Sequence, residues 1–192
     1  MPDMSQQPAT RGGIRRAFAG YAPTVANGAF VAETALLLGD VVVGSGSSIW
    51  YGCVLRGDGN LLRIGERTNI QDGTIVHVNH QEDGGRGAPG FSTLVGSDVT
   101  VGHMAMLHAC VLEDFAFVGM NATVMDAAVV ESDAMVAAGA LVTPGKRVPR
   151  GELWAGRPAR KMRDLSPAEI LDNRHSAAYY AEIAVRYLKE GL

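Results

Sequence analysis

The chain has 192 residues and a formal net charge of −3, a size that suits one globular domain and a charge that argues against nucleic acid as the main partner. It contains no run near the roughly 20 apolar residues that a membrane-spanning helix needs, so we expect no membrane partner. Glycine is abundant at 24 residues and aromatic residues make up only 6%, as expected for a chain that turns often.

Residues 1–30 contain no apolar stretch of the kind found in a secretion signal. We therefore expect a loose N-terminal arm and a cytoplasmic protein. Cys53 and Cys110 lie far apart without CxxC spacing, which predicts small buried side chains in a reducing compartment.

From residue 31 to residue 142, a Val, Leu or Ile recurs at every sixth position, with short breaks. A period of six fits neither a helix nor a strand of ordinary length, but it fits a short strand plus a turn. Three such units close a triangular coil, with the aliphatic residue filling the axis and a small residue, four positions later, at the tight corner. The pattern predicts an all-β fold. The aliphatic positions are Val31, Leu37, Val43, Ile49, Leu55, Ile64, Ile70, Val76, Val95, Val101, Leu107, Leu112, Val118, Val124, Val130, Val136 and Val142.

The rest of the chain divides around this coil. Residues 57–62 and 78–94 interrupt it as loops, and residues 143–165 form a Pro- and Gly-broken, basic connector. A C-terminal helix is expected over residues 166–190, because Ser166 can cap it, Pro167 suits its first position and Glu169 can reach back to the cap. Its apolar stripe, which we expect to pack along one face of the coil, contains Ile170, Ala177, Tyr180 or Ala181, Ala184 and Leu188.

The repeat also predicts where the histidines lie. Successive hexapeptides occupy three faces in turn, and if the interruptions use up no face, Leu55, Val76 and Leu107 stack in successive coils. Side chains alternate along a strand, so the residue after each of them points outward. His77 is therefore expected beside His108, at one interstrand spacing of roughly 4.8 Å.

A third histidine, His103, belongs to the preceding hexapeptide and lies around a corner of the coil. It cannot close a site with His77 and His108 in one chain, but it can do so from a neighbouring chain in a threefold homotrimer. Three histidines with an open fourth position describe a catalytic zinc site. His80 and His175 do not fit the register and are expected to be non-ligands.

Several of these segments together resemble the gamma-class carbonic anhydrases. The resemblance extends over roughly residues 20–165 and is carried by residues 55–58 (LRGD), 67–74 (RTNIQDGT), 76–77 (VH), 101–103 (VGH) and 107–110 (LHAC). It implies a left-handed parallel β-helix of hexapeptide repeats, a homotrimer, and zinc, iron or cobalt as the metal. It further implies a lyase that converts carbon dioxide reversibly to bicarbonate.

The resemblance also implies roles for polar residues near the histidines. Arg56 and Asp72 correspond to an ion pair between subunits, although they could hold the trimer together without a catalytic role. Gln71 corresponds to the residue that orients hydroxide or bicarbonate, with Asn69 beside it, or else it caps a coil edge. Asp58 corresponds to a hydrogen-bonding partner of the site, or else it belongs to turn chemistry.

A tyrosine and a proton shuttle complete the set that the resemblance implies. Tyr180 corresponds to the tyrosine that folds back towards the metal; Tyr179 is its competitor, and simple helix packing is the alternative. The family's acidic loop, which ferries protons, is replaced here by a different sequence, in which Glu82, Asp83 or His80 could serve.

Two other classes of function remain open. Hexapeptide coils also build acyl-coenzyme A transferases, and residues 154–159 (WAGRPA) resemble the segment that follows the coil in those enzymes. Alternatively, the same metal site could hydrolyse a thioester or serve a binding role without turnover.

Overall fold

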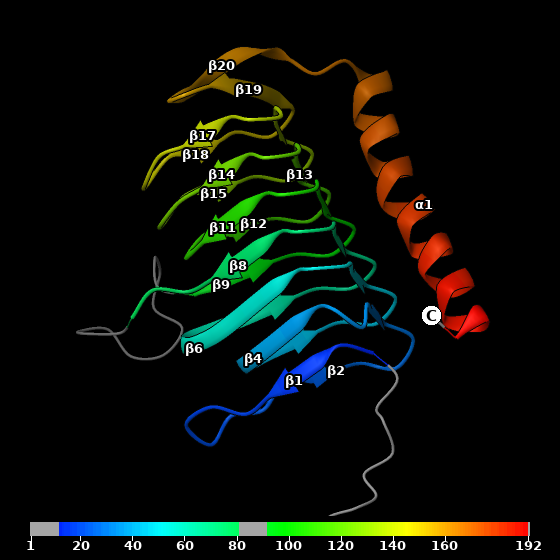
Figure 1. The fold of residues 1–192 in the computed structure, drawn as a ribbon. Coiled ribbons are helices and arrows are strands. Elements are labelled where there is room, and N and C mark those ends of the chain that lie inside the picture. Colours follow the sequence, from blue (N-terminus) through cyan, green and yellow to red (C-terminus); the bar gives the residue numbers. More distant parts are fainter. Residues whose placement is uncertain (1–11, 81–91, 192) are drawn as a thin grey trace, which may run out of the picture.

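The computed structural model describes residues 12–80 and 92–191, and Glu82 and Asp83 lie outside this range. The fold is a left-handed parallel β-helix with a single C-terminal helix along its side (Figure 1). The prediction of an all-β coil of hexapeptide repeats is therefore confirmed. None of the described helical residues forms a segment that is long and apolar enough to span a bilayer.

The strands form three flat faces. The helix face contains the short strands β3 (Phe30–Val31), β5 (Ser48–Ile49), β7 (Asn69–Ile70), β10 (Thr100–Val101), β13 (Phe117–Val118) and β16 (Met135–Val136). The histidine face contains β1 (Ile14–Arg16), the first halves of β4 (Leu36–Val43) and β6 (Val54–Ile64), then β8 (Ile75–His77), β11 (Met106–His108), β14 (Thr123–Val124) and β17 (Leu141–Val142). The third face contains β2 (Thr24–Val25), the second halves of β4 and β6, β9 (Thr93–Val95), β12 (Val111–Leu112), β15 (Val129–Val130) and β18 (Arg147–Val148).

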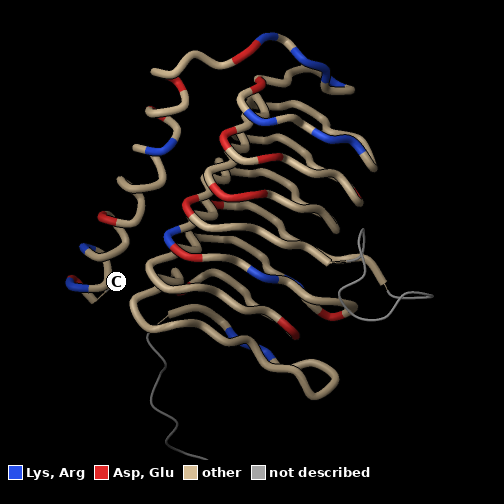
Figure 2. The backbone as a smooth tube through the Cα atoms, turned by 180° about the vertical axis from the view of Figure 1, so that it is seen from behind, with Lys and Arg blue, Asp and Glu red and all other residues tan. Residues whose placement is uncertain are grey.

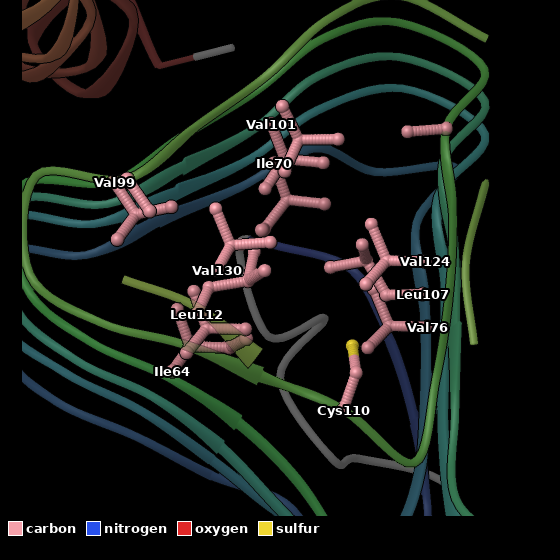
Figure 3. Close-up of a cluster of buried hydrophobic side chains, with 14 of the residues drawn as sticks. Ile64, Ile70, Val76, Val99, Val101, Leu107, Cys110, Leu112, Val124 and Val130 are labelled. Atoms are coloured by element: carbon pink, nitrogen blue, oxygen red, sulfur yellow. The ribbon is translucent and has the colours of Figure 1, made fainter. Parts of the chain in front are cut away.

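The core is the axis of the coil, filled by the aliphatic residues of the repeat. Figure 3 shows these side chains pointing inward from all three faces, in columns such as Val76, Leu107 and Val124. Their exposed fractions are at or near zero. Full burial of one such side chain contributes about 1.5–3 kcal/mol, so the column of aliphatic residues is the main source of stability.

The corners of the coil differ in one detail from the expectation. The residue with left-handed backbone stands three positions after most of the aliphatic residues, one earlier than the small side chain; examples are Gly73 (φ 71°), Asn121 (φ 57°) and Asp133 (φ 58°). The small residue follows and points inward, as Ala122 and Ala134 show with 0% exposure. It is small because the space inside the corner is already occupied by the axial column.

The strand pairing extends beyond the expected limits of 31–142 at both ends. In the N-terminal segment, β1 and β2 pair with β4, and in the connector β18 pairs with β15. The coil then ends in an antiparallel hairpin of β19 (Glu152–Gly156) and β20 (Ala159–Asp164), where β19 pairs with β16. These segments pair because the backbone groups of the last regular coils need hydrogen-bond partners.

Helix α1 (Pro167–Glu190) starts at the hairpin end and runs back along the helix face (Figure 1). Ser166 and Glu169 form the expected capping box. The buried helical residues include Ala177 and Ala184, but Leu188 is 42% exposed. Ala177, Tyr180 and Ala184 of the expected apolar stripe thus pack on this face. Ile183 and Tyr187 complete the stripe instead of Leu188, because they pack with Tyr180 against the rings of Phe30 and Trp50.

A charged clamp also fixes the helix. Figure 2 shows acidic and basic residues along the corner of the coil nearest to α1. There Asp133, with a side chain only 3% exposed, accepts hydrogen bonds from Arg150 and from the helical Arg174. Arg174 also lies over the ring of Phe115, 4.3 Å from its centroid. The helix face is thus covered by the chain itself.

Candidate metal centre

His77 and His108 lie side by side on the histidine face. Strand β8 pairs with both β6 and β11, so that Arg56, His77 and His108 occupy one row across three successive coils. The two imidazole rings have centroids 5.1 Å apart. Residues 57–62, expected as a loop, lie within the continuous strand β6. Neither this stretch nor residues 78–94 uses up a face of the coil, and the predicted stacking of these two histidines is confirmed.

An aspartate holds the first of these rings. His77 Nε2 lies 3.0 Å from Asp58 Oδ1, and Arg56 donates to the other oxygen of Asp58. Burial raises the pKa of Asp58, but the hydrogen bonds from His77 and Arg56 outweigh it and hold the pKa below its usual value. Burial lowers the pKa of His77 in spite of Asp58. A carboxylate beside a neutral imidazole is the form that metal binding requires.

A second aspartate, which the sequence analysis missed, holds the other ring. His108 Nδ1 lies 3.0 Å from Asp126 Oδ2, and Asn79 Nδ2 donates to the second oxygen of Asp126 at 2.8 Å. The signal was present in the repeat, because Val124 stacks on Leu107. The residue two positions after Val124 therefore lies close to the residue one position after Leu107.

His103 lies apart from this pair, at the corner between β10 and β11. Its Nδ1 is 2.9 Å from Asp72 Oδ2, and both side chains are more than 40% exposed. His103 stands three residues before β11, and His108 is the last residue of that strand, which spans about 10 Å. Arg56 and Asp72 do not pair within the chain, since Arg56 contacts Asp58 and Asp72 contacts His103.

Gln71 lies at the same corner as Asp72 and is only 6% exposed. Its Nε2 donates to Asn69 Oδ1 at 3.0 Å, and Asn69 in turn donates to Thr100 Oγ1 at 2.9 Å. Asn69, which we expected among the catalytic residues, has no exposed surface. Within one chain it can influence a substrate only by fixing the orientation of Gln71.

Tyr180 is the better placed of the two candidate tyrosines. It packs edge-on against Trp50 at 5.6 Å and lines a pocket that also contains Asp72. Burial and the charge of Asp72 raise the pKa of the Tyr180 phenol, so it stays protonated near neutral pH. Tyr179 lines the same pocket but is 57% exposed. The pocket joins the helix to the corner that carries His103.

The donor set fits a transition metal shared between chains. His77, His103 and His108 each face an aspartate through one ring nitrogen, which leaves the other nitrogen of each ring for a metal. Imidazole nitrogen suits zinc, iron and related ions. Within residues 12–80 and 92–191, no three His, Cys, Asp or Glu side chains of one chain converge as metal ligands.

The chain is similar to proteins of known name. It is 51% identical over 168 residues to "Gamma carbonic anhydrase 2, mitochondrial" of Arabidopsis thaliana, covering 88% of this chain and 59% of the relative, so it spans about three fifths of that protein. It is 36% identical to protein YrdA of Escherichia coli, covering 93% and 96% of the two chains. Among solved structures, a hexapeptide transferase family protein from Anaplasma phagocytophilum superimposes with a TM-score of 0.83 and is 46% identical in sequence. The match covers 91% of this chain and 98% of that protein.

A scan against models of protein families gives no match. The likeness to these relatives nevertheless extends over most of the chain, between 88% and 93% of its residues. The chain therefore belongs to the gamma-class carbonic anhydrase family of hexapeptide-repeat proteins.

Proposed function

We propose that this protein catalyses the reversible hydration of carbon dioxide to bicarbonate, with zinc as the metal, or iron or cobalt in its place. The observation that carries the proposal is the division of the histidines. His77 and His108 form a stacked pair at one end of the strands of the histidine face, and His103 lies at the other end. Each half carries its own aspartate partners, yet neither half supplies enough ligands alone.

A threefold homotrimer brings the two halves together. In a closed ring of three copies, one edge of the histidine face meets the opposite edge of the next copy. Each interface then has His77 and His108 from one copy and His103 from its neighbour. Such an assembly also brings Arg56 of one copy towards Asp72 of the next, in accord with the ion pair that the family resemblance implies.

The chemistry follows from the ligands and their surroundings. Zinc held by these three histidines would lower the pKa of a coordinated water to about 7 and would supply a nucleophile for carbon dioxide at neutral pH. Gln71 orients the reacting oxygen through its amide, which Asn69 holds from behind. Asp58 keeps His77 in position, and Tyr180 closes the helix side of the pocket.

Protons must leave the site after each turnover. His80 is exposed and follows Asn79 directly, so among the described candidates it is placed to carry protons to solvent. Glu82 and Asp83 are the other candidates of this loop. Replacement of His80 by alanine is expected to lower the rate at low buffer concentration and to be rescued by added imidazole.

Stopped-flow measurement of carbon dioxide hydration tests the activity, with protein prepared without oxygen and loaded with zinc or iron. Mixed trimers test the interface. Chains with His103→Ala and chains with His108→Ala are expected to be inactive separately, and each mixed trimer should regain about one third of its sites. A metal-loaded protein without hydration activity contradicts the proposed reaction, and a mixture that regains nothing contradicts the shared site.

Acyl transfer from coenzyme A is the second candidate. It is favoured by the 46% identity to a protein described as a hexapeptide transferase family member. Isothermal titration with acetyl-coenzyme A separates the two functions: we expect no micromolar binding. Thioester hydrolysis or metal binding without turnover would appear as a metal-loaded trimer that does not hydrate carbon dioxide.

A further inference from the structure

Two aspartates enclose the pair of stacked histidines. Along the histidine face the order is Asp58, His77, His108 and Asp126, each from a successive coil. The family resemblance implied a partner role for Asp58 only. We propose that Asp126 is a positioning residue that fixes His108 for the metal, with Asn79 as its anchor. This inference rests on the proposed metal site.

The carboxylate of Asp126 is held at both oxygens. Oδ2 faces His108 Nδ1 at 3.0 Å, and Oδ1 accepts from Asn79 Nδ2 at 2.8 Å. The backbone on both sides is also fixed, because Met125 N–H donates to Val142 O and Ala127 N–H donates to Ala109 O. A carboxylate held in this way cannot rotate away from the imidazole, so it constrains the ring.

This contact selects one tautomer of His108. A carboxylate accepts hydrogen bonds, so the proton of the neutral imidazole resides on Nδ1 and the lone pair is on Nε2. Nε2 is then the atom that His108 offers to a metal. Asp126 comes from the coil of β14 on one side of His108, and its anchor Asn79 follows β8 on the other side, so the carboxylate that holds the ring is itself tied across the coil of His108. Loss of the carboxylate frees both the tautomer and the ring orientation.

The test measures the dissociation constant for Co²⁺ by competition with a chelator, together with the visible spectrum of the bound ion. Asp126→Ala is expected to weaken binding 10- to 100-fold, the range for partners of metal-bound histidines. Asp126→Asn should weaken it less, because its amide oxygen still accepts from Nδ1–H. Asn79→Ala should have the smallest effect, since it only releases the far oxygen of Asp126.

Asp114→Ala is the matched control. Asp114 also stands two positions after a buried aliphatic residue, Leu112, but it accepts from the backbone of Ser97 and contacts no histidine. Thermal unfolding of the metal-free variants checks that they fold. If Asp126 had a purely structural role, its replacement would lower the stability of the protein and leave the spectrum of the bound cobalt unchanged.

Wild-type Co²⁺ affinity in both Asp126 variants overturns the inference, and so does wild-type affinity in His108→Ala. A wild-type protein that binds Co²⁺ through His108 but does not hydrate carbon dioxide contradicts only the proposed function.

Discussion

The helix face and the histidine face share one backbone geometry but differ in what covers them. On the helix face, Phe30 and Trp50 are 1% and 5% exposed because α1 packs over them. On the histidine face, Ile75 and Met106 remain 40% and 37% exposed beside the paired histidines. The chain closes one face by itself and leaves the other, which carries the pair of His77 and His108, uncovered. Stability and chemistry are therefore expected to respond to different substitutions.

Loss of a metal ligand is the largest expected effect. Loss of a hydrogen-bonding partner of a metal ligand weakens metal binding by up to about 100-fold. His103→Ala removes a ligand itself, so it should weaken metal binding by more than this and abolish hydration. The fold of the single chain should persist, because this side chain is 42% exposed. Metal content after gel filtration is the measurement. His175→Ala, on the exposed side of α1, is the control and should retain the wild-type metal content.

Removal of an aromatic ring from the helix face is expected to have the next largest effect. Trp50→Ala is expected to destabilise the protein by about 3–5 kcal/mol, because it leaves a cavity beneath α1 between Phe30, Tyr180 and Tyr187. Denaturant unfolding measures this change. Tyr179→Ala, at a site that is 57% exposed, should change stability far less; equal losses would mean that the helix does not pack as described.

The charged clamp is expected to contribute less than the aromatic cluster. Asp133→Asn keeps a residue that tolerates the left-handed backbone but removes the charge that both arginines face. A loss of about 1–3 kcal/mol is expected, limited by the exposure of Arg150 and Arg174. Unfolding experiments should show this loss at unchanged metal affinity. A change in metal affinity instead would couple the helix face to the metal centre.

The smallest effect concerns pH. Hydrogen bonds from Arg163 and from the Ser166 cap lower the pKa of Glu169 from 4.5 to about 2. A carboxylate whose pKa is lowered in the folded state stabilises the fold at pH values above its pKa in the unfolded chain. This contribution should therefore disappear as the pH falls from 4.5 towards 2. Melting temperature against pH should therefore fall less steeply for Glu169→Gln than for the wild type. Identical slopes would show that the cap contributes nothing in solution.

The repeat made much of this structure predictable. Its period and the alternation of strand side chains are local properties, and they were enough to predict the coil and the stacking of His77 on His108. The capping box at Ser166 is equally local. The three-histidine site between chains, the metal and the cytoplasmic location stay predictions, because each depends on partners or surroundings that a single chain does not contain.

Other features depend on which side chains meet across coils, and the sequence did not reveal them. Asp126 was missed although the register placed it near His108, because a carboxylate two residues after an aliphatic position faces a histidine in one coil and a backbone amide in another. Likewise, Asp72 turns to His103 within the chain, and Ile183 and Tyr187, not Leu188, complete the apolar stripe of α1.

The sequence by itself determined the architecture and the row in which two histidines stack, because a strict period leaves the backbone one way to bury its aliphatic residues. Only the tertiary structure decided which carboxylate holds each imidazole and which face the helix covers. Those choices depend on the rotamers of side chains from separate coils, which the repeat pattern does not specify.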